Sequence, residues 1–241
     1  MSYSENPYQS FGVPVDMASA DARVSFIRKT YIHLTGAVLG FAFLCAILLQ
    51  IPAVQDICAS FLQNRFYYLI AMFGLIGVSY LCQNWAANST SVGTQYMGLV
   101  LYTVAESIFF LPLLWLAGQI APGAIESAGV ITLAVFIGLT LSVFITRADF
   151  SFLRTGLFIA TFAALGIAIC LMFIPSIQGP NLGLLISGVF VVLAAGYILY
   201  HTSMVLHHYP VGMHVAASLA LFASLVTLFW YILQIMMSRR N

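Results

Sequence analysis

Seven long apolar stretches dominate the chain and restrict its fold more than any other feature. Crossing a hydrocarbon core of about 30 Å takes about 20 residues of helix, and each stretch is long enough. Each must be helical, because lipid offers no partners for unpaired backbone groups. The predicted spans are Tyr31 to Val54, Phe66 to Trp85, Gln95 to Gly118, Ser127 to Thr146, Phe152 to Pro175, Asn181 to Ser203, and His214 to Met237.

Composition supports an integral membrane protein. Of the 241 residues, 62% are hydrophobic and 6% are charged, against about 25% charged in a soluble domain. The scattered basic residues argue against a nucleic-acid partner. We expect an all-α membrane protein with a polar N-terminal arm (1–30), a seven-helix transmembrane domain (31–237) and a short basic C-terminal tail (238–241). A GxxxG pair, Gly36 and Gly40, is a possible packing site between helices.

Basic residues near the span ends predict the orientation, because they favour the cytoplasmic side. With the N-terminus in the cytoplasm, five basic residues lie inside and three lie outside. Those inside are Arg23, Arg28, Lys29, Arg147 and Arg154, and those outside are Arg65, Arg239 and Arg240. We therefore expect a cytoplasmic N-terminus.

Glu106 is the carboxylate deepest within a predicted span. A charged residue at mid-bilayer costs about 2.5–3.5 kcal/mol, so it usually faces a cavity or a partner. Two interpretations remain open: a role in an ion or proton pathway, or a protonated group that hydrogen-bonds a neighbouring helix. In the turn after the fourth span, Arg147, Asp149 and Ser151 are expected to have structural roles as helix caps and headgroup anchors.

Histidines cluster around the loop before the last span. His201 and His208 share a helix face, and His214 follows PVG. These three are the candidates for a metal site, but no strong ligand spacing is present, so no metal and no cofactor is expected. Because an imidazole titrates near neutral pH, these histidines are also candidates for a proton sensor. No nucleophile motif or phosphate loop appears, and an enzyme is not expected.

Three short motifs resemble those of the Bax inhibitor-1 family, including its bacterial inner-membrane branch. TRADFS (146–151) resembles T-x-x-D-x-S, GYILYHTS (196–203) resembles G-x-x-x-Y-D-T-Q, and LALFASLVTLF (219–229) resembles L-x-L-Y-L-D-F-I-N-L-F. The resemblance implies a seven-helix bundle with the last helix at its centre, in a bacterial-type cytoplasmic (inner) membrane. It also implies a passive, pH-sensitive calcium leak gated by two aspartates.

Both aspartates are replaced in this chain, by His201 and Ser224. A neutral imidazole can hydrogen-bond a hydroxyl group, and acid would add positive charge where the family pair loses negative charge. We therefore expect acid to inhibit cation passage here. Glu106, His201 and Ser224 are the candidates for the ion pathway and its gate.

Two functions of different kinds follow from these residues and the resemblance. The first is a passive, pH-modulated cation leak, with calcium as the implied ion. The alternative is a non-enzymatic regulator that binds other membrane proteins, such as a membrane protease. A leak requires Glu106, His201 and Ser224 to converge on one interior track, whereas a regulator does not.

Overall fold

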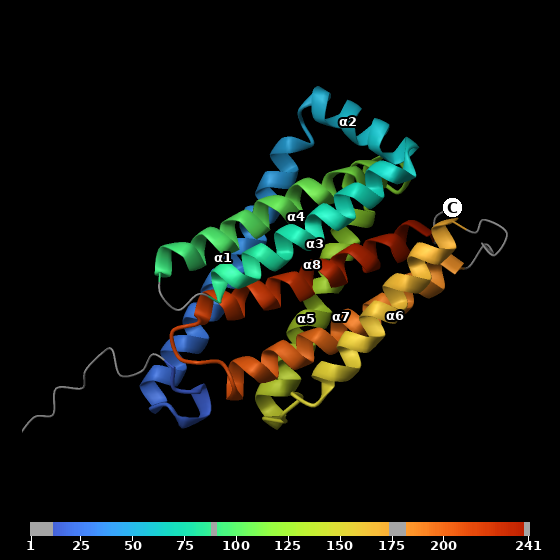
Figure 1. Ribbon diagram of the computed structural model, residues 1–241. Helices are drawn as coiled ribbons and strands as arrows, with labels where there is room; N and C mark the ends of the chain where they lie inside the picture. The colour runs from blue at the N-terminus through green and yellow to red at the C-terminus, as the bar shows by residue number, and fades with distance from the viewer. Residues whose placement is uncertain (1–11, 88–90, 174–181, 239–241) are drawn as a thin grey trace, which may run out of the picture.

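The computed structural model describes residues 12–87, 91–173 and 182–238 (Figure 1). A short 3-10 helix, η1 (Val15–Met17), precedes the α-helices of these segments. They are α1 (Ala20–Leu48), α2 (Pro52–Gln63), α3 (Arg65–Ala86), α4 (Val92–Ile120), α5 (Ala124–Thr146), α6 (Leu153–Phe173), α7 (Leu182–His207) and α8 (His214–Ser238). All but α2 contain a stretch long and apolar enough to cross a membrane, which confirms the seven predicted spans.

The first helix begins earlier than hydropathy indicated. Ser19 accepts a hydrogen bond from the Ala22 N–H, and Asp21 stabilises the first turn, so α1 starts at Ala20 rather than Tyr31. The second part of the predicted arm is therefore helical. Residues 1–11 of that arm, and Arg239 and Arg240 of the predicted tail, lie outside the described residues.

A short helix, α2, lies between the first two spans, where a loop was expected. Pro52 stands at its first position, where a missing N–H costs nothing. In Figure 1, α2 caps one end of the bundle at an angle to the long helices. Cys58 is buried on this helix.

The last helix is the centre of the bundle, as predicted. α8 packs against α1, α3, α4, α5 and α7 and is the most deeply buried of the seven long helices. Figure 1 shows it running between α3 on one side and α6 and α7 on the other. Leu219, Leu221 and Phe222 are among its fully buried side chains.

A close approach of two helices occurs at Gly98 rather than at the predicted GxxxG pair. A Cβ atom at Gly98 would lie 2.6 Å from the Cys82 carbonyl oxygen, so only glycine lets α4 approach the α3 backbone here. At Gly36 a Cβ would meet nothing within 4 Å, and at Gly40 its nearest neighbour would be a Thr103 methyl carbon at 3.8 Å. The GxxxG glycines therefore do not make a tight contact.

The segment before α1 is tied to the loop between α7 and α8. The Val15 N–H donates to the Tyr209 carbonyl at 3.0 Å, and the Val211 N–H donates to the Val13 carbonyl at 2.9 Å. The Val15 side chain is fully buried, and the Arg23 guanidinium donates to the Val15 carbonyl. The start of α1 and the α7–α8 loop therefore lie at the same end of the bundle.

Candidate ion pathway along the last helix

Four polar side chains form a stripe along the second half of α8: Ser224, Thr227, Tyr231 and Gln234. Their spacings of three, four and three residues place them on one face of a helix. With a rise of 1.5 Å per residue, the stripe is about 15 Å long, or about half of a hydrocarbon core. At its far end, the Ser187 hydroxyl of α7 donates to Gln234 Oε1 at 3.0 Å.

A cavity of about 400 Å³, here called the His201 cavity, lies against this stripe. His201 and Ser224, the two residues at the family's aspartate positions, both line it. Helices α3, α6, α7 and α8 all contribute to its wall. Its polar lining comprises Gln83, Thr161, Tyr197, His201, Ser224, Thr227 and Tyr231.

A second cavity of about 230 Å³, here called the Glu106 cavity, adjoins the first. Thr227 and Tyr231 line both cavities, so the two meet along the polar stripe of α8. Ser79 of α3 and Glu106 of α4 add polar groups to the second cavity. The three residues predicted for the pathway therefore line two adjoining cavities.

Glu106 is held in place from its own helix. Its side chain is 6% exposed, and the Tyr102 hydroxyl, one turn earlier on α4, hydrogen-bonds to its carboxyl group. Among the residues that line the two cavities, it is the only carboxylate. A cation entering either cavity would meet a formal negative charge only here.

His201 and Ser224 share a cavity but do not form the hydrogen bond that the sequence argument anticipated. The Ser224 hydroxyl donates to the Ala220 carbonyl of its own helix at 3.0 Å. His201 Nδ1 is buried and has no hydrogen-bond partner among the described residues. The ring is held instead by Tyr197, nearly parallel to it at 5.9 Å, and by Tyr200 at 4.9 Å.

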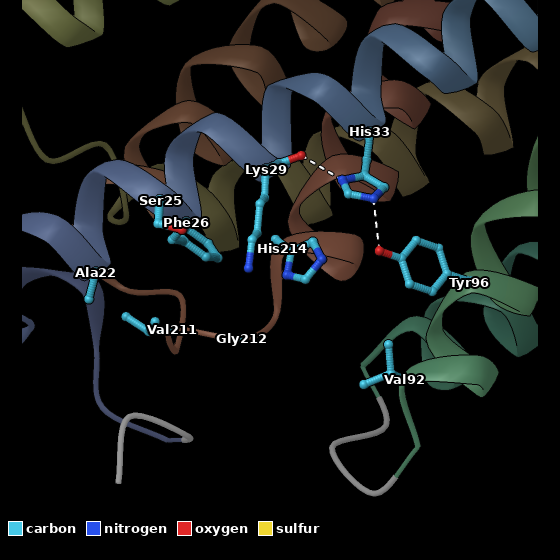
Figure 2. A pocket seen from close by; sticks show the side chains of 10 residues that line it. All are labelled: Ala22, Ser25, Phe26, Lys29, His33, Val92, Tyr96, Val211, Gly212 and His214. Carbon is cyan, nitrogen blue, oxygen red and sulfur yellow. Dashed lines mark hydrogen bonds between the residues drawn. The ribbon is translucent and has the colours of Figure 1, made fainter. Parts of the chain in front are cut away.

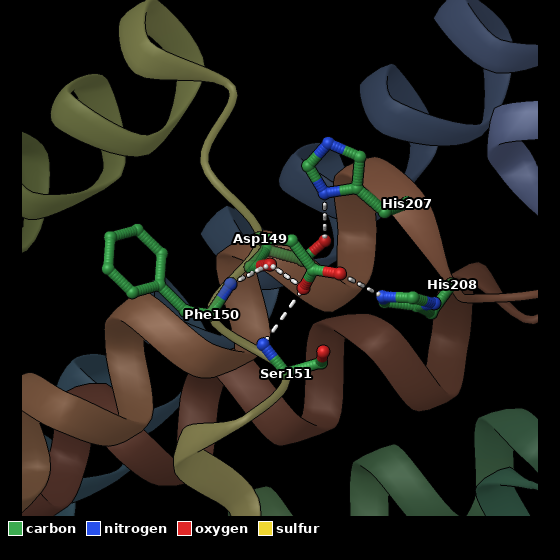
Figure 3. A network of polar contacts seen from close by, with 6 residues as sticks. Asp149, Phe150, Ser151, His207 and His208 are labelled. Carbon is green, nitrogen blue, oxygen red and sulfur yellow. Dashed lines mark hydrogen bonds and ion pairs between the residues drawn. The ribbon is translucent and has the colours of Figure 1, made fainter.

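The turn between α5 and α6 has a denser polar network than simple capping requires (Figure 3). Arg147 ends α5 in the left-handed conformation, with φ of 50°. Asp149 Oδ1 accepts the Ser151 N–H at 2.8 Å and the Ser203 hydroxyl at 3.1 Å, and the ring Nε2 of His208 pairs with Oδ2 at 2.9 Å. Asp149 therefore joins this turn to the end of α7.

These contacts stabilise the charged form of Asp149. The hydrogen bond from the Ser151 backbone is the main cause, and the His208, Ser151 and Ser203 side chains add to it. Together they hold the pKa of the Asp149 carboxyl well below its usual range. The sequence identified Asp149 as structural but missed His208 and Ser203, which are distant in sequence and carry no local signal of the pairing.

The candidate metal-binding histidines do not come together. His201 lines the His201 cavity, His208 pairs with Asp149, and His214 packs beside His33 with ring centroids 5.0 Å apart. Across the described ranges, no three His, Cys, Asp or Glu side chains are grouped so that they could hold a metal ion. Sequence reasoning also missed Thr227 and Tyr231 of the cavity walls, although the spacing of Ser224, Thr227 and Tyr231 by three and four residues was visible.

Seven apolar helices, the last enclosed by the others, define a multi-pass integral membrane protein. The family model described as "Inhibitor of apoptosis-promoting Bax1" matches residues 23–241. The chain belongs to the Bax inhibitor-1 family.

Curated relatives agree with this assignment. Bax inhibitor 1 of Schizosaccharomyces pombe is 29% identical over 95% of this chain and 82% of its own length. An uncharacterised protein of Pseudomonas aeruginosa is 33% identical over 71% of this chain and 73% of its own. Protein lifeguard 4 of Mus musculus is 24% identical over 93% of this chain and 90% of its own length.

Proposed function

We propose that this protein is a passive cation pathway, with calcium as the ion. The observation that carries the proposal is the adjoining pair of cavities, which brings His201 and Ser224 together and places Glu106 beside the same polar stripe. An isolated intramembrane carboxylate that faces a cavity attracts a cation at the least desolvation cost. Hydroxyl and amide oxygens along the stripe are hard ligands of the kind that calcium prefers.

The N-terminal half of α8 acts as the seal in this proposal. Leu221 of α8 is fully buried, as are Ile198 and Val205 of α7, and all belong to one hydrophobic core. The polar stripe begins only at Ser224, so the structure is a closed form. Flux therefore requires α7 and α8 to separate at this packed half.

Acid should reduce the flux. Protonation of His201 would place a positive charge in the cavity that adjoins Glu106 and would repel an entering cation. The titratable groups that line the His201 cavity with it are Tyr197 of α7 and Tyr231 of α8, and neither carries compensating negative charge near neutrality. The pH response should thus be opposite to that of a gate built from two carboxylates.

Calcium uptake into liposomes containing only the purified protein tests this proposal. Wild type should exceed protein-free liposomes at about pH 8 and lose that flux as acid protonates the imidazole of His201. The double variant His201→Asp plus Ser224→Asp should show the reverse pH profile. Identical profiles would remove His201 from the gate, and wild-type flux equal to that of protein-free liposomes would reject the pathway.

A regulator that binds other membrane proteins, such as a membrane protease, is the second candidate. It is favoured by the presence of one carboxylate in the cavities, where the family resemblance implies a further pair. It predicts co-purification with a partner that depends on the N-terminal arm. Truncation should stop at residue 11, because removal through residue 22 would also delete Val15 and its contact with Tyr209. Loss of the partner on truncation, together with wild-type flux no higher than that of protein-free liposomes, would favour the regulator.

We also propose a cytoplasmic N-terminus in a bacterial-type cytoplasmic membrane. The support is that Arg23, Lys29 and Arg147 lie at one end of the bundle, since Asp149 and Val15 both contact the same end of α7. A concentration of basic residues at one end favours the cytoplasmic side. Labelling of a cysteine introduced at Ser19 from either side of the membrane would test this orientation.

A further inference from the structure

A third cavity, of about 540 Å³, lies at the N-terminal end of the bundle and away from the proposed pathway (Figure 2). Its wall comes from the first turns of α1, the start of α4 and the loop that leads into α8. Four side chains there carry polar groups of interest: Lys29, His33, Tyr96 and His214. None of these residues lines either cavity of the pathway.

The lining is cationic. Lys29 is the only lysine of the chain, and Figure 2 shows its side chain extending toward the loop, beside His214. No carboxylate lines the cavity, and Lys29 makes no ion pair within the described part of the chain. α8 begins at His214, so the partial positive charge of the helix end adds to the lysine charge.

His33 and Tyr96 are already oriented by hydrogen bonds. The Lys29 carbonyl can only accept, so His33 Nδ1–H donates to it, at 2.6 Å. In the neutral ring, Nε2 is then the acceptor, and the Tyr96 hydroxyl donates to it at 2.9 Å. The His214 ring packs against His33, so the side chain of Lys29 is the cationic group left facing the cavity (Figure 2).

The position of the cavity corresponds to the headgroup layer. α1 has 29 residues, which at 1.5 Å each gives about 43 Å and exceeds the hydrocarbon thickness of about 30 Å. The turns before Lys29 therefore extend beyond the hydrocarbon. Apolar side chains, Phe26, Val92 and Val211, complete the wall and suit the glycerol and first methylene groups of a lipid.

We propose that this cavity binds a phosphate group, with Lys29 as its counter-ion. Its volume falls within the usual range for a small-molecule site and far exceeds that of a bare inorganic ion. The ligand that best matches the charge, the depth and the apolar wall is the headgroup of an anionic phospholipid. The inference does not depend on whether the protein conducts cations.

The test measures dissociation constants of the purified full-length protein in neutral detergent. The probes are short-chain phosphatidylglycerol, short-chain phosphatidylcholine and inorganic phosphate. Wild type is compared with Lys29→Gln and with Arg28→Gln. Arg28 is the matched control, because it carries the same charge at the same depth but does not line the cavity. Thermal unfolding checks that each variant is folded.

Phosphatidylglycerol should bind wild type about tenfold more tightly than phosphatidylcholine, and Lys29→Gln should remove about that factor while Arg28→Gln does not. If inorganic phosphate displaces phosphatidylglycerol at similar concentrations, the phosphate site stands, and its ligand is a soluble phosphate compound rather than a lipid headgroup. Equal losses in Lys29→Gln and Arg28→Gln would overturn the proposal in favour of general surface charge. No loss in Lys29→Gln would also overturn it.

Discussion

The two halves of α8 differ in character although they belong to one continuous apolar helix. In the N-terminal half, Val215, Ala217, Leu219 and Leu221 are almost completely buried, so neighbouring helices enclose this half on several sides. In the C-terminal half, Thr227 is exposed and lines both the His201 cavity and the Glu106 cavity. A single helix can therefore seal a bundle at one end and line a polar track at the other.

The difference follows from what each half packs against. The closed half lies near the α7–α8 loop, the docked N-terminal segment and the Asp149 network, which together fix the helix ends. The open half lines cavities whose walls include α3 and α6, the spans with the smallest buried share. The polar stripe therefore faces these cavities, while Leu228 and Leu233 of the same half are fully buried on other sides of the helix.

The largest stability effect is expected from Leu221→Ala in the closed half. Leu221 is fully buried, so its truncation leaves a cavity and should lower the free energy of unfolding by about 2–4 kcal/mol. Thr227→Ala is the comparison on the polar stripe, and its exposed side chain should make its cost far smaller. Denaturant unfolding in detergent measures both. Equal losses would contradict the contrast between the two halves.

A smaller effect is expected from Asp149→Asn, which weakens the network that anchors the closed half. The carboxylate is about half exposed, so solvent screening should limit the loss at neutral pH to about 0.5–1 kcal/mol. The pKa of Asp149 is lowered in the folded state, so its stabilisation is present above the unfolded pKa and is lost as pH falls through the folded pKa.

The stability difference between wild type and Asp149→Asn should therefore be constant from neutral pH to about pH 5 and shrink below about pH 4. Unfolding measured across this range provides its own control, because both proteins share every other titrating group. A difference that persists unchanged into strong acid would show that the charge of Asp149 does not contribute.

Hydropathy predicted the spans because membrane insertion depends on summed apolar length, which is visible residue by residue. It could not reveal α2, which is too short to span, or the Gly98 contact, which depends on the partner helix. The central position of α8 came from the family resemblance rather than from composition. The predicted start of α1 was wrong, because the helix begins with polar residues such as Asp21, which hydropathy does not count as part of a span.

The candidate site was partly predictable for a similar reason. Aligning short motifs placed His201 and Ser224 at matched positions, and the structure shows that both line one cavity. Glu106 was identified because a carboxylate is costly to place in a lipid bilayer, and that cost can be judged without knowing which residues surround it. The pairing of Asp149 with His208, 59 residues away, was not predictable, because only the fold brings those two turns together.

The most direct test of the pathway is calcium flux through Glu106→Gln in protein-only liposomes, with Glu126→Gln as the control. Both variants remove one carboxylate with little change in shape, but Glu126 is exposed on the first turn of α5 and lines neither cavity. The pathway predicts that Glu106→Gln reduces flux to near the protein-free rate while Glu126→Gln conducts like wild type. Full flux through a folded Glu106→Gln would contradict it.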